Sequence, residues 1–126
     1  MKIVVTGTRD WEEPEAVQQT LWGALRELHE QHPNLEVLVG DARGVDSWAY
    51  AYCMGRGIPV RRFAAKWRDG GVYNPRAGHD RNQAMINELP DLCLAVWDRR
   101  STGTKDCMDR AFCAGITIRF LLGAPA

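Results

Sequence analysis

The sequence contains little that would suggest a membrane protein, a metal centre or a disulfide framework. No apolar run approaches the roughly 18 residues of a membrane span, and no charged-then-apolar leader begins the chain, so we expect neither a span nor a signal peptide. Four cysteines are present, and none forms a C-x-x-C pair or a zinc-type spacing. We therefore expect no metal, no cofactor, reduced thiols and a cytoplasmic location.

Net charge is also absent, because 16 basic residues balance 16 acidic ones. A protein that holds nucleic acid on a broad basic surface carries an excess of positive charge, so direct DNA binding is not expected. Lysine is scarce, with three lysines against 13 arginines. Since arginine presents a planar fork that suits phosphate and carboxylate groups, the positions of the arginines matter more than their number.

Short β-branched runs alternate with segments of helical periodicity. We expect strands over 3–5, 35–39, 60–64, 92–97 and 116–122, helices over 14–29, 45–53, 84–89 and 105–114, and an irregular loop over 66–78. This alternation is typical of a parallel sheet with crossover helices. The sequence predicts one Rossmann-like, doubly wound α/β domain over 1–126, with about five parallel strands and helices on both faces.

Glycines and arginines gather where these strands end. The segments 6–10, 40–44, 66–79 and 98–105 follow four of the strands and would meet at one sheet edge, where doubly wound folds bind their ligands. Glycine permits close backbone approach, and helix N-termini present free N–H groups to anions. Neither G-x-G-x-x-G nor a P-loop occurs. We expect a phosphate-bearing small molecule, unless the glycines only form turns and the arginines are solvated.

Four stretches in order, "VVTGTRDW", "VGDARGVDSWA", "AGHDRNQAM" and "STGTKDCMDRA", resemble the small YspA-like branch of the SLOG superfamily. LONELY GUY phosphoribohydrolases and the Rossmann domain of DNA-processing protein A are more distant relatives in it. The resemblance implies a pocket for a nucleotide or a nucleotide-derived ligand. It assigns a phosphate-side loop to Gly40, Ala42, Arg43, Gly44 and Asp46, and a second phosphate loop to Ser101, Thr102, Gly103, Thr104 and Asp106.

The same resemblance places Arg81 on an arginine of the cytokinin-activating relatives, and it also shows departures. Asp41 stands where related chains usually have a second glycine, and Asp98-Arg99-Arg100-Ser101 replaces a Pro-Gly-Gly run. Cys107 occupies the position of the glutamate of the phosphoribohydrolases, and Asp106 precedes it by one residue. Hydrolysis by the relatives' route is therefore in doubt.

The expected ligand-binding set combines the strand ends with these motifs. It comprises Gly7, Thr8, Arg9, Gly40, Asp41, Ala42, Arg43, Gly44, Asp46, Arg81, Asn82, Ser101, Thr102, Gly103 and Thr104. Candidate catalytic residues are Arg81, Asp106 and Asp98, and Asp10 is a possible carboxylate partner of Asp98.

Each of these residues also has a purely structural interpretation. Asp46 suits the first turn of a helix, Arg81 has Asp80 and Glu88 as candidate ion-pair partners, and Thr104 is the simplest N-cap of the last helix. The aromatic residues of this edge either stack on a base or pack beneath a loop; they are Trp11, Trp67 and Tyr73. His79 is the histidine nearest this edge.

Three functions remain open. The first is binding or sensing of a nucleotide-like ligand, and the second is hydrolysis of a nucleotide N-glycosidic bond with a non-standard carboxylate. The third is an interaction module, for which self-association is favoured over DNA, with Trp22 expected on an exposed helix face. A nucleotide-like small molecule and a second copy of the chain are the expected partners.

Overall fold

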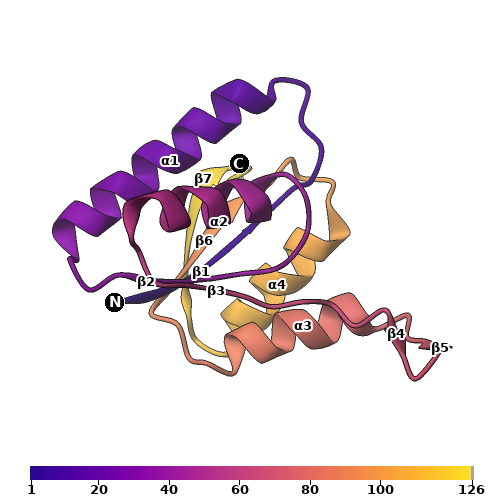
Figure 1. Ribbon diagram of the computed structural model, residues 1–126. Helices are drawn as coiled ribbons and strands as arrows, with labels where there is room; N and C mark the ends of the chain where they lie inside the picture. Colours follow the sequence, from indigo (N-terminus) through magenta and orange to yellow (C-terminus); the bar gives the residue numbers. More distant parts are fainter. Residues whose placement is uncertain (126) are drawn as a thin grey trace.

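The computed structural model describes residues 1–125, and strands and helices alternate along it as the sequence predicts (Figure 1). The elements in chain order are β1 (Lys2–Gly7), α1 (Pro14–Gln31), β2 (Glu36–Val39), α2 (Val45–Arg56), β3 (Val60–Arg62), β4 (Arg68–Asp69), β5 (Val72–Tyr73), α3 (Ala77–Ile86), β6 (Leu92–Val96), α4 (Thr102–Cys113) and β7 (Thr117–Leu122).

Five of the strands form one parallel sheet in the order β3-β2-β1-β6-β7, which confirms the predicted Rossmann-like class. β1 is the central strand, and its Ile3 pairs with Val37 of β2 on one side and Leu92 of β6 on the other. From β1 the chain proceeds outward to β2 and β3, and it then crosses to β6 on the other side of β1. The strand order therefore reverses between β1 and β6. Ligands of doubly wound folds bind beside such a reversal, at the carboxyl ends of the strands.

Helices cover both faces of the sheet, with α1 and α2 on one face and α3 and α4 on the other (Figure 1). Successive side chains of a strand point to opposite faces, so Ile3 and Val5 pack against α1 and α2, whereas Val4 packs against α3 and α4. All three are fully buried. This double burial is the reason why the strands are continuous apolar runs rather than alternating ones.

The segment between β3 and α3 is more ordered than the sequence suggested. Instead of one irregular loop over 66–78, it forms a small antiparallel hairpin of β4 and β5, which projects from the sheet (Figure 1). Gly70 and Gly71 make the turn with φ values of 58° and 84°. The helix predicted over 84–89 begins earlier, at Ala77, where the carbonyl of Asn74 accepts the N–H of Ala77 at 3.2 Å.

Trp22 does not lie on an exposed helix face. Its Nε1–H donates to the carbonyl of Trp48 at 3.1 Å, and its ring stacks on Tyr52 with centroids 6.1 Å apart. This side chain therefore fixes α1 against α2. None of the helices within residues 1–125 has the length and apolarity needed to cross a membrane.

Candidate functional site

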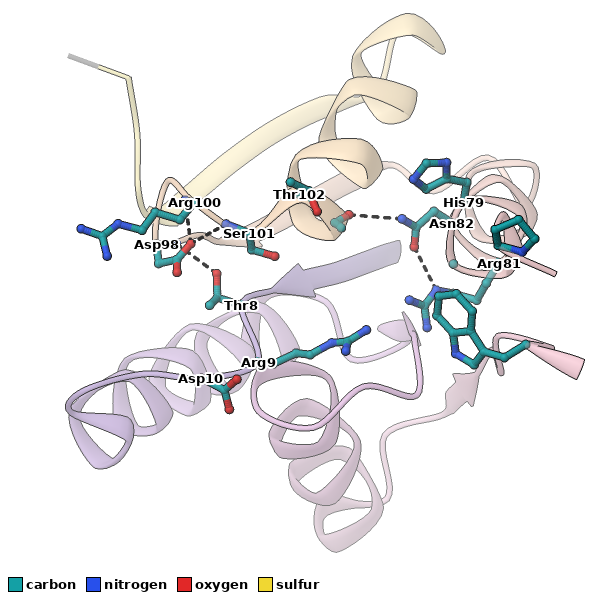
Figure 2. Close-up of a pocket in the computed structure, with 14 residues that line it drawn as sticks. Thr8, Arg9, Asp10, His79, Arg81, Asn82, Asp98, Arg100, Ser101 and Thr102 are labelled. Atoms are coloured by element: carbon teal, nitrogen blue, oxygen red, sulfur yellow. Dashed lines mark hydrogen bonds between the residues drawn. The ribbon is translucent and has the colours of Figure 1, made fainter. Parts of the chain in front are cut away.

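A cavity of about 540 Å³ opens at the carboxyl ends of β1 and β6. It is lined by Thr8, Arg9, Asp10, Trp67, Pro75, Gly78, His79, Arg81, Asn82, Asp98, Arg100, Ser101, Thr102 and Gly103. Figure 2 shows two walls: the β1 end and the β6–α4 turn on one side, and α3 with His79, Arg81 and Asn82 on the other. Arg9 extends from the β1 end across the space between them (Figure 2). The cavity lies where the strand order reverses.

The end of β1 is fixed by backbone contacts. Thr8 donates its N–H to the carbonyl of Val96 at 3.0 Å, and its hydroxyl accepts the N–H of Asp98 at 3.1 Å, which ties β1 to the turn after β6. A Cβ on Gly7 would lie 2.5 Å from the side chain of Val45. Gly44 has a φ of 78° and lies directly against the carbonyl of Arg9. These two glycines bring the start of α2 against β1.

The turn between β6 and α4 is built around Asp98. One oxygen of its carboxylate accepts the N–H groups of Arg100 and Ser101, each at 2.8 Å. Partial burial acts to raise the pKa of Asp98, but these N–H groups outweigh it and lower the pKa below its usual value. Arg99 takes a left-handed conformation, with a φ of 69°, that favours glycine. The carboxylate thus shapes a turn that holds a non-glycine residue in the left-handed region.

The first turn of α4 opens into the cavity. Ser101 is its N-cap, since the Ser101 hydroxyl accepts the N–H of Thr104 at 3.4 Å; the expectation that Thr104 caps this helix is wrong, because α4 begins at Thr102. No protein acceptor is recorded among residues 1–125 for the N–H groups of Thr102 and Gly103. A Cβ on Gly103 would meet open space. Free N–H groups at the positive end of a helix are a ready anion site.

Arg81 is held at the cavity edge by a carboxylate that is distant from it in sequence. Its Nη1 lies 2.9 Å from Asp41 Oδ1, and its Nε donates to Asn82 Oδ1 at 2.9 Å. The ion pair therefore forms with Asp41 and not with Asp80 or Glu88. A Cβ on Gly40 would lie directly against the Arg81 guanidinium. Gly40 thus makes room for this arginine.

Asp46 lies beneath the cavity and is only 6% exposed. Its Oδ2 accepts the N–H of Ala42 at 3.3 Å. Burial raises the pKa of Asp46 to about 6, against the opposing effects of the Arg81 charge and of the Ala42 N–H. A carboxylate that changes charge near pH 6 therefore lies behind the arginine.

Asp106 faces α3 and does not line the cavity. Its Oδ2 accepts from Arg110 Nε at 2.8 Å and from Asn82 Nδ2 at 3.0 Å, and His79 Nε2 lies 3.9 Å from its other oxygen. Burial acts to raise the pKa of Asp106, yet the Arg110 and Asn82 hydrogen bonds lower it overall. Asn82 also donates to the carbonyl of Gly103 at 3.2 Å and so joins α3 to the first turn of α4.

The structure brings many of the expected ligand residues together, but not all. The cavity takes in Thr8, Arg9, Arg81, Asn82, Ser101, Thr102 and Gly103, and a hollow of about 40 Å³ beneath it adds Gly7, Ala42, Asp46 and Thr104. Gly40, Asp41, Arg43 and Gly44 line neither space. Arg43 is instead exposed and forms a two-pronged ion pair with Asp10, with Nη2 2.7 Å from Oδ2.

One wall of the cavity was absent from the expected ligand set. Trp67 lines the cavity and is 41% exposed, and its ring stacks on Tyr73 with centroids 6.4 Å apart. Gly78 lies beside this ring, and a Cβ there would make an ordinary contact with Trp67 at 3.4 Å. Pro75 and His79 complete the wall. The signal in the sequence was the pair of aromatics in a long loop, for which burial under the loop is the commoner case and stacking on a base the alternative.

Comparison with known proteins gives matches over most of the chain. The family model described as the YspA, cpYpsA-related SLOG family matches residues 1–70. The Gene 61 protein of Mycobacterium phage D29 is 35% identical over 123 residues, which cover 93% of both chains.

Three solved structures share the fold at low identity. DNA processing protein A from Helicobacter pylori, whose structure addresses its single-stranded DNA binding mode, aligns with 95% of this chain at a TM-score of 0.74 and 16% identity. The Streptococcus pneumoniae protein aligns with 98% at 0.70 and 17%, and the structural genomics target TM1055 with 93% at 0.72 and 16%. This chain spans 64%, 50% and 71% of their respective lengths. By its sequence matches and in agreement with its fold, the chain belongs to the YspA, cpYpsA-related SLOG family.

Proposed function

We propose that the chain binds a nucleotide or a nucleotide-derived phosphate ligand in the cavity at the β1 and β6 ends. The observation that carries the proposal is the first turn of α4, where Thr102 and Gly103 line the cavity and their N–H groups have no protein acceptor in the described structure. Arg9 and Arg81 line the same space. A helix N-terminus with two guanidinium groups beside it suits a phosphate.

The opposite wall suits the base of such a ligand. Trp67 and Pro75 offer flat apolar surfaces, and His79 and Asn82 supply polar atoms at the same wall. A few polar groups in an otherwise apolar wall are typical of small-molecule sites. Membership of the SLOG family and the likeness of fold to its members favour a nucleotide-related role in the same way.

The test is native mass spectrometry of the purified protein with nucleoside mono-, di- and triphosphates, ADP-ribose and cyclic nucleotides. We expect a bound mass for at least one of them, and a loss of affinity of roughly tenfold or more in Arg9→Ala, since hydrogen bonds to charged groups contribute about 1.5–3 kcal/mol. Arg119→Ala is the matched control, because Arg119 is an exposed arginine on β7. No binding to any compound, or equal losses in both variants, contradicts the proposal.

Gly103→Ala tests the helix end directly. The added methyl group meets open space rather than protein, so it should leave the fold intact while adding bulk to the helix turn proposed to hold the phosphate. We expect bound ligand to disappear from the mass spectrum of this variant while its unfolding midpoint does not fall. Unchanged binding would place the ligand elsewhere in the cavity.

A second candidate, hydrolysis of a nucleotide N-glycosidic bond, is favoured by two cavity carboxylates. Asp10 and Asp98 both line the cavity, and the pKa of each is lowered, Asp10 chiefly by its hydrogen bonds from Arg43. Ionised carboxylates stabilise the oxocarbenium-like state through which such a bond breaks. Release of free base that is lost in Asp98→Asn and retained in Asp69→Asn would establish it. If the bound nucleotide stays intact, hydrolysis is excluded and binding remains as the function.

A further inference from the structure

Arginine guanidinium groups lie over aromatic rings along one edge of the sheet. Within residues 1–125 four such pairs are present, and all fall in residues 50–73: Arg56 over Tyr52 at 5.1 Å, Arg61 over Phe63 at 5.0 Å, Arg62 over Tyr50 at 4.3 Å and Arg68 over Tyr73 at 5.8 Å. A guanidinium within about 6 Å of a ring centroid is attracted by the ring. The arginine–aromatic pairs of the described residues are therefore concentrated in this one segment.

The same segment is strongly basic, although the whole chain is neutral. Residues 50–76 contain six basic residues and one acidic residue, so this stretch carries a formal charge of +5 and the remainder −5. The six basic residues, Arg56, Arg61, Arg62, Lys66, Arg68 and Arg76, are all exposed. The net charge of zero therefore conceals a separation of charge along the chain. The expectation that the protein does not bind DNA directly was based on the net charge of the whole chain, and it does not apply to this basic edge.

These residues follow one continuous border of the fold. β3 is the outermost strand of the sheet, α2 lies beside it, and the chain after β3 leads into the projecting β4–β5 hairpin (Figure 1). Near the other end of the border, a hollow of about 280 Å³ between α1 and α2 is lined by Trp22, Tyr52, Arg26 and Arg56. We call residues 50–76 together with this hollow the β3 border.

The arginines of the β3 border are largely free to bind an anion. Among residues 1–125 Arg61 has an ion-pair partner, Glu88, but no carboxylate partner is recorded for Arg56, Arg62 or Arg68. A guanidinium stacked on a ring is held in place by its face, and its N–H edge remains available. Arg62 on Tyr50 has the shortest of these separations. Such groups are pre-oriented for the oxygens of a phosphate chain.

We propose that the β3 border binds single-stranded nucleic acid, with phosphates on Arg56 and Arg62 and bases on the exposed rings of the hairpin. Tyr73 is 56% exposed and Trp67 is 41% exposed, so both present aromatic surface to solvent. Basic tracks with aromatic platforms are the arrangement by which proteins hold unpaired strands, because every base has a face that stacks. In a duplex the base faces are already stacked on one another and are not accessible to the rings. An acidic protein surface has no bases that could stack on the rings.

Fluorescence anisotropy with labelled oligo(dT) and oligo(U) tests the proposal in the full-length protein. Removing one arginine contact in Arg62→Ala should weaken binding roughly tenfold and reduce the slope of log affinity against log salt by about 0.7. Arg62→Lys keeps the charge but loses the planar guanidinium, and its affinity should lie between that of the parent protein and that of Arg62→Ala. Arg119→Ala, on the opposite outer strand β7, removes one exposed arginine and should change neither quantity.

Tyr73→Ala separates nucleic acid from other polyanions. It removes an exposed ring and no charge, and we expect oligonucleotide binding to weaken about tenfold, as for other base-stacking residues. Binding of either oligo(dT) or oligo(U) supports the proposal, whichever of the two binds more tightly. Equal affinity for a duplex, equal competition by polyglutamate, or identical losses in Arg62→Ala and Arg119→Ala would overturn it. Arg56, Arg62 and Tyr73 do not line the cavity, so variants at these positions test this proposal independently of the small-molecule proposal, whereas Trp67 belongs to both sites.

Discussion

Replacing Asp46 with asparagine should remove a loss of stability that the protein suffers as the pH rises. Asp46 is 6% exposed, and burial raises its pKa from the usual 3.8 to about 6. Between these values the folded protein binds more protons than the unfolded chain. By linkage, the contribution of Asp46 to the free energy of unfolding is highest below about pH 3.8 and is lost as the pH rises through about 6.

The size of this loss follows from the two pKa values. Each unit corresponds to about 1.36 kcal/mol, so the fall from acid to neutral pH is about 3 kcal/mol for this one group. Asparagine keeps an acceptor for the Ala42 N–H at 3.3 Å and carries no charge at any pH. We therefore expect the stability advantage of Asp46→Asn over the parent protein to grow by about 3 kcal/mol between roughly pH 4 and pH 7.

Urea unfolding of both proteins at a series of pH values measures this difference directly. The comparison between the two profiles isolates Asp46 from all other titrating groups. Asp69→Asn, which neutralises an exposed carboxylate on the hairpin, is the matched control and should follow the parent profile. If the profiles of Asp46→Asn and the parent run parallel over this range, the buried carboxylate is not titrating near pH 6 and the reasoning fails.

Three further changes test the local geometry. Gly103→Ala, in the first turn of α4 with open space around the new Cβ, should raise the free energy of unfolding by up to about 1 kcal/mol, and a loss on thermal unfolding would show a hidden clash. Gly44→Ala should cost about 2 kcal/mol or more, because φ is 78° and the new Cβ would meet the carbonyl of Arg9; a neutral result in urea would refute this strain. Ser101→Ala should cost about 1 kcal/mol through the lost N-cap, whereas Ser47→Ala, within α2, serves as the comparison.

The architecture was predictable because the signal for it is repeated at every strand. Ile3, Val4 and Val5 are buried on alternate faces, and such doubly covered strands appear in sequence as uninterrupted apolar runs. The alternation with helices then fixes a parallel sheet, and the parallel sheet fixes the edge at which ligands bind. The placement of Thr8, Arg9 and Ser101 around one cavity follows from these steps alone.

The start of α3 was not predictable in the same way. Asn74, Pro75 and Gly78 are ordinary signals for a loop, and they placed the helix several residues too late. In the structure the side chain of Asn74 accepts the N–H of Arg76 at 3.0 Å, which turns the chain into the helix. Gly78 lies within the helix, where it does not interrupt the hydrogen bonding. The Asn74 contact is local, but an Asn-Pro pair suits a loop as well as a turn into a helix, so the pattern alone does not decide where the helix begins.

The partners of individual ion pairs were harder still to predict from the sequence. Arg81 had acidic neighbours along its own helix, but its partner is Asp41, which is 40 residues away in sequence. Asp10 and Asp98 were considered as a pair, yet Asp10 binds Arg43 and Asp98 binds the backbone of its own turn. Such choices depend on side-chain directions at the sheet edge, which only the assembled fold defines.

The carboxylate of Asp41 has one oxygen on Arg81 and the other on the N–H of Ala65, at 3.3 Å. Ala65 precedes Trp67 by two residues, so a single side chain connects Arg81 to the segment that carries Trp67, and both residues line the cavity. An anion that draws Arg81 away leaves Asp41 with the Ala65 contact alone. Trp67 therefore lies close to the group that an anion would displace. Its fluorescence emission should change when an anion binds.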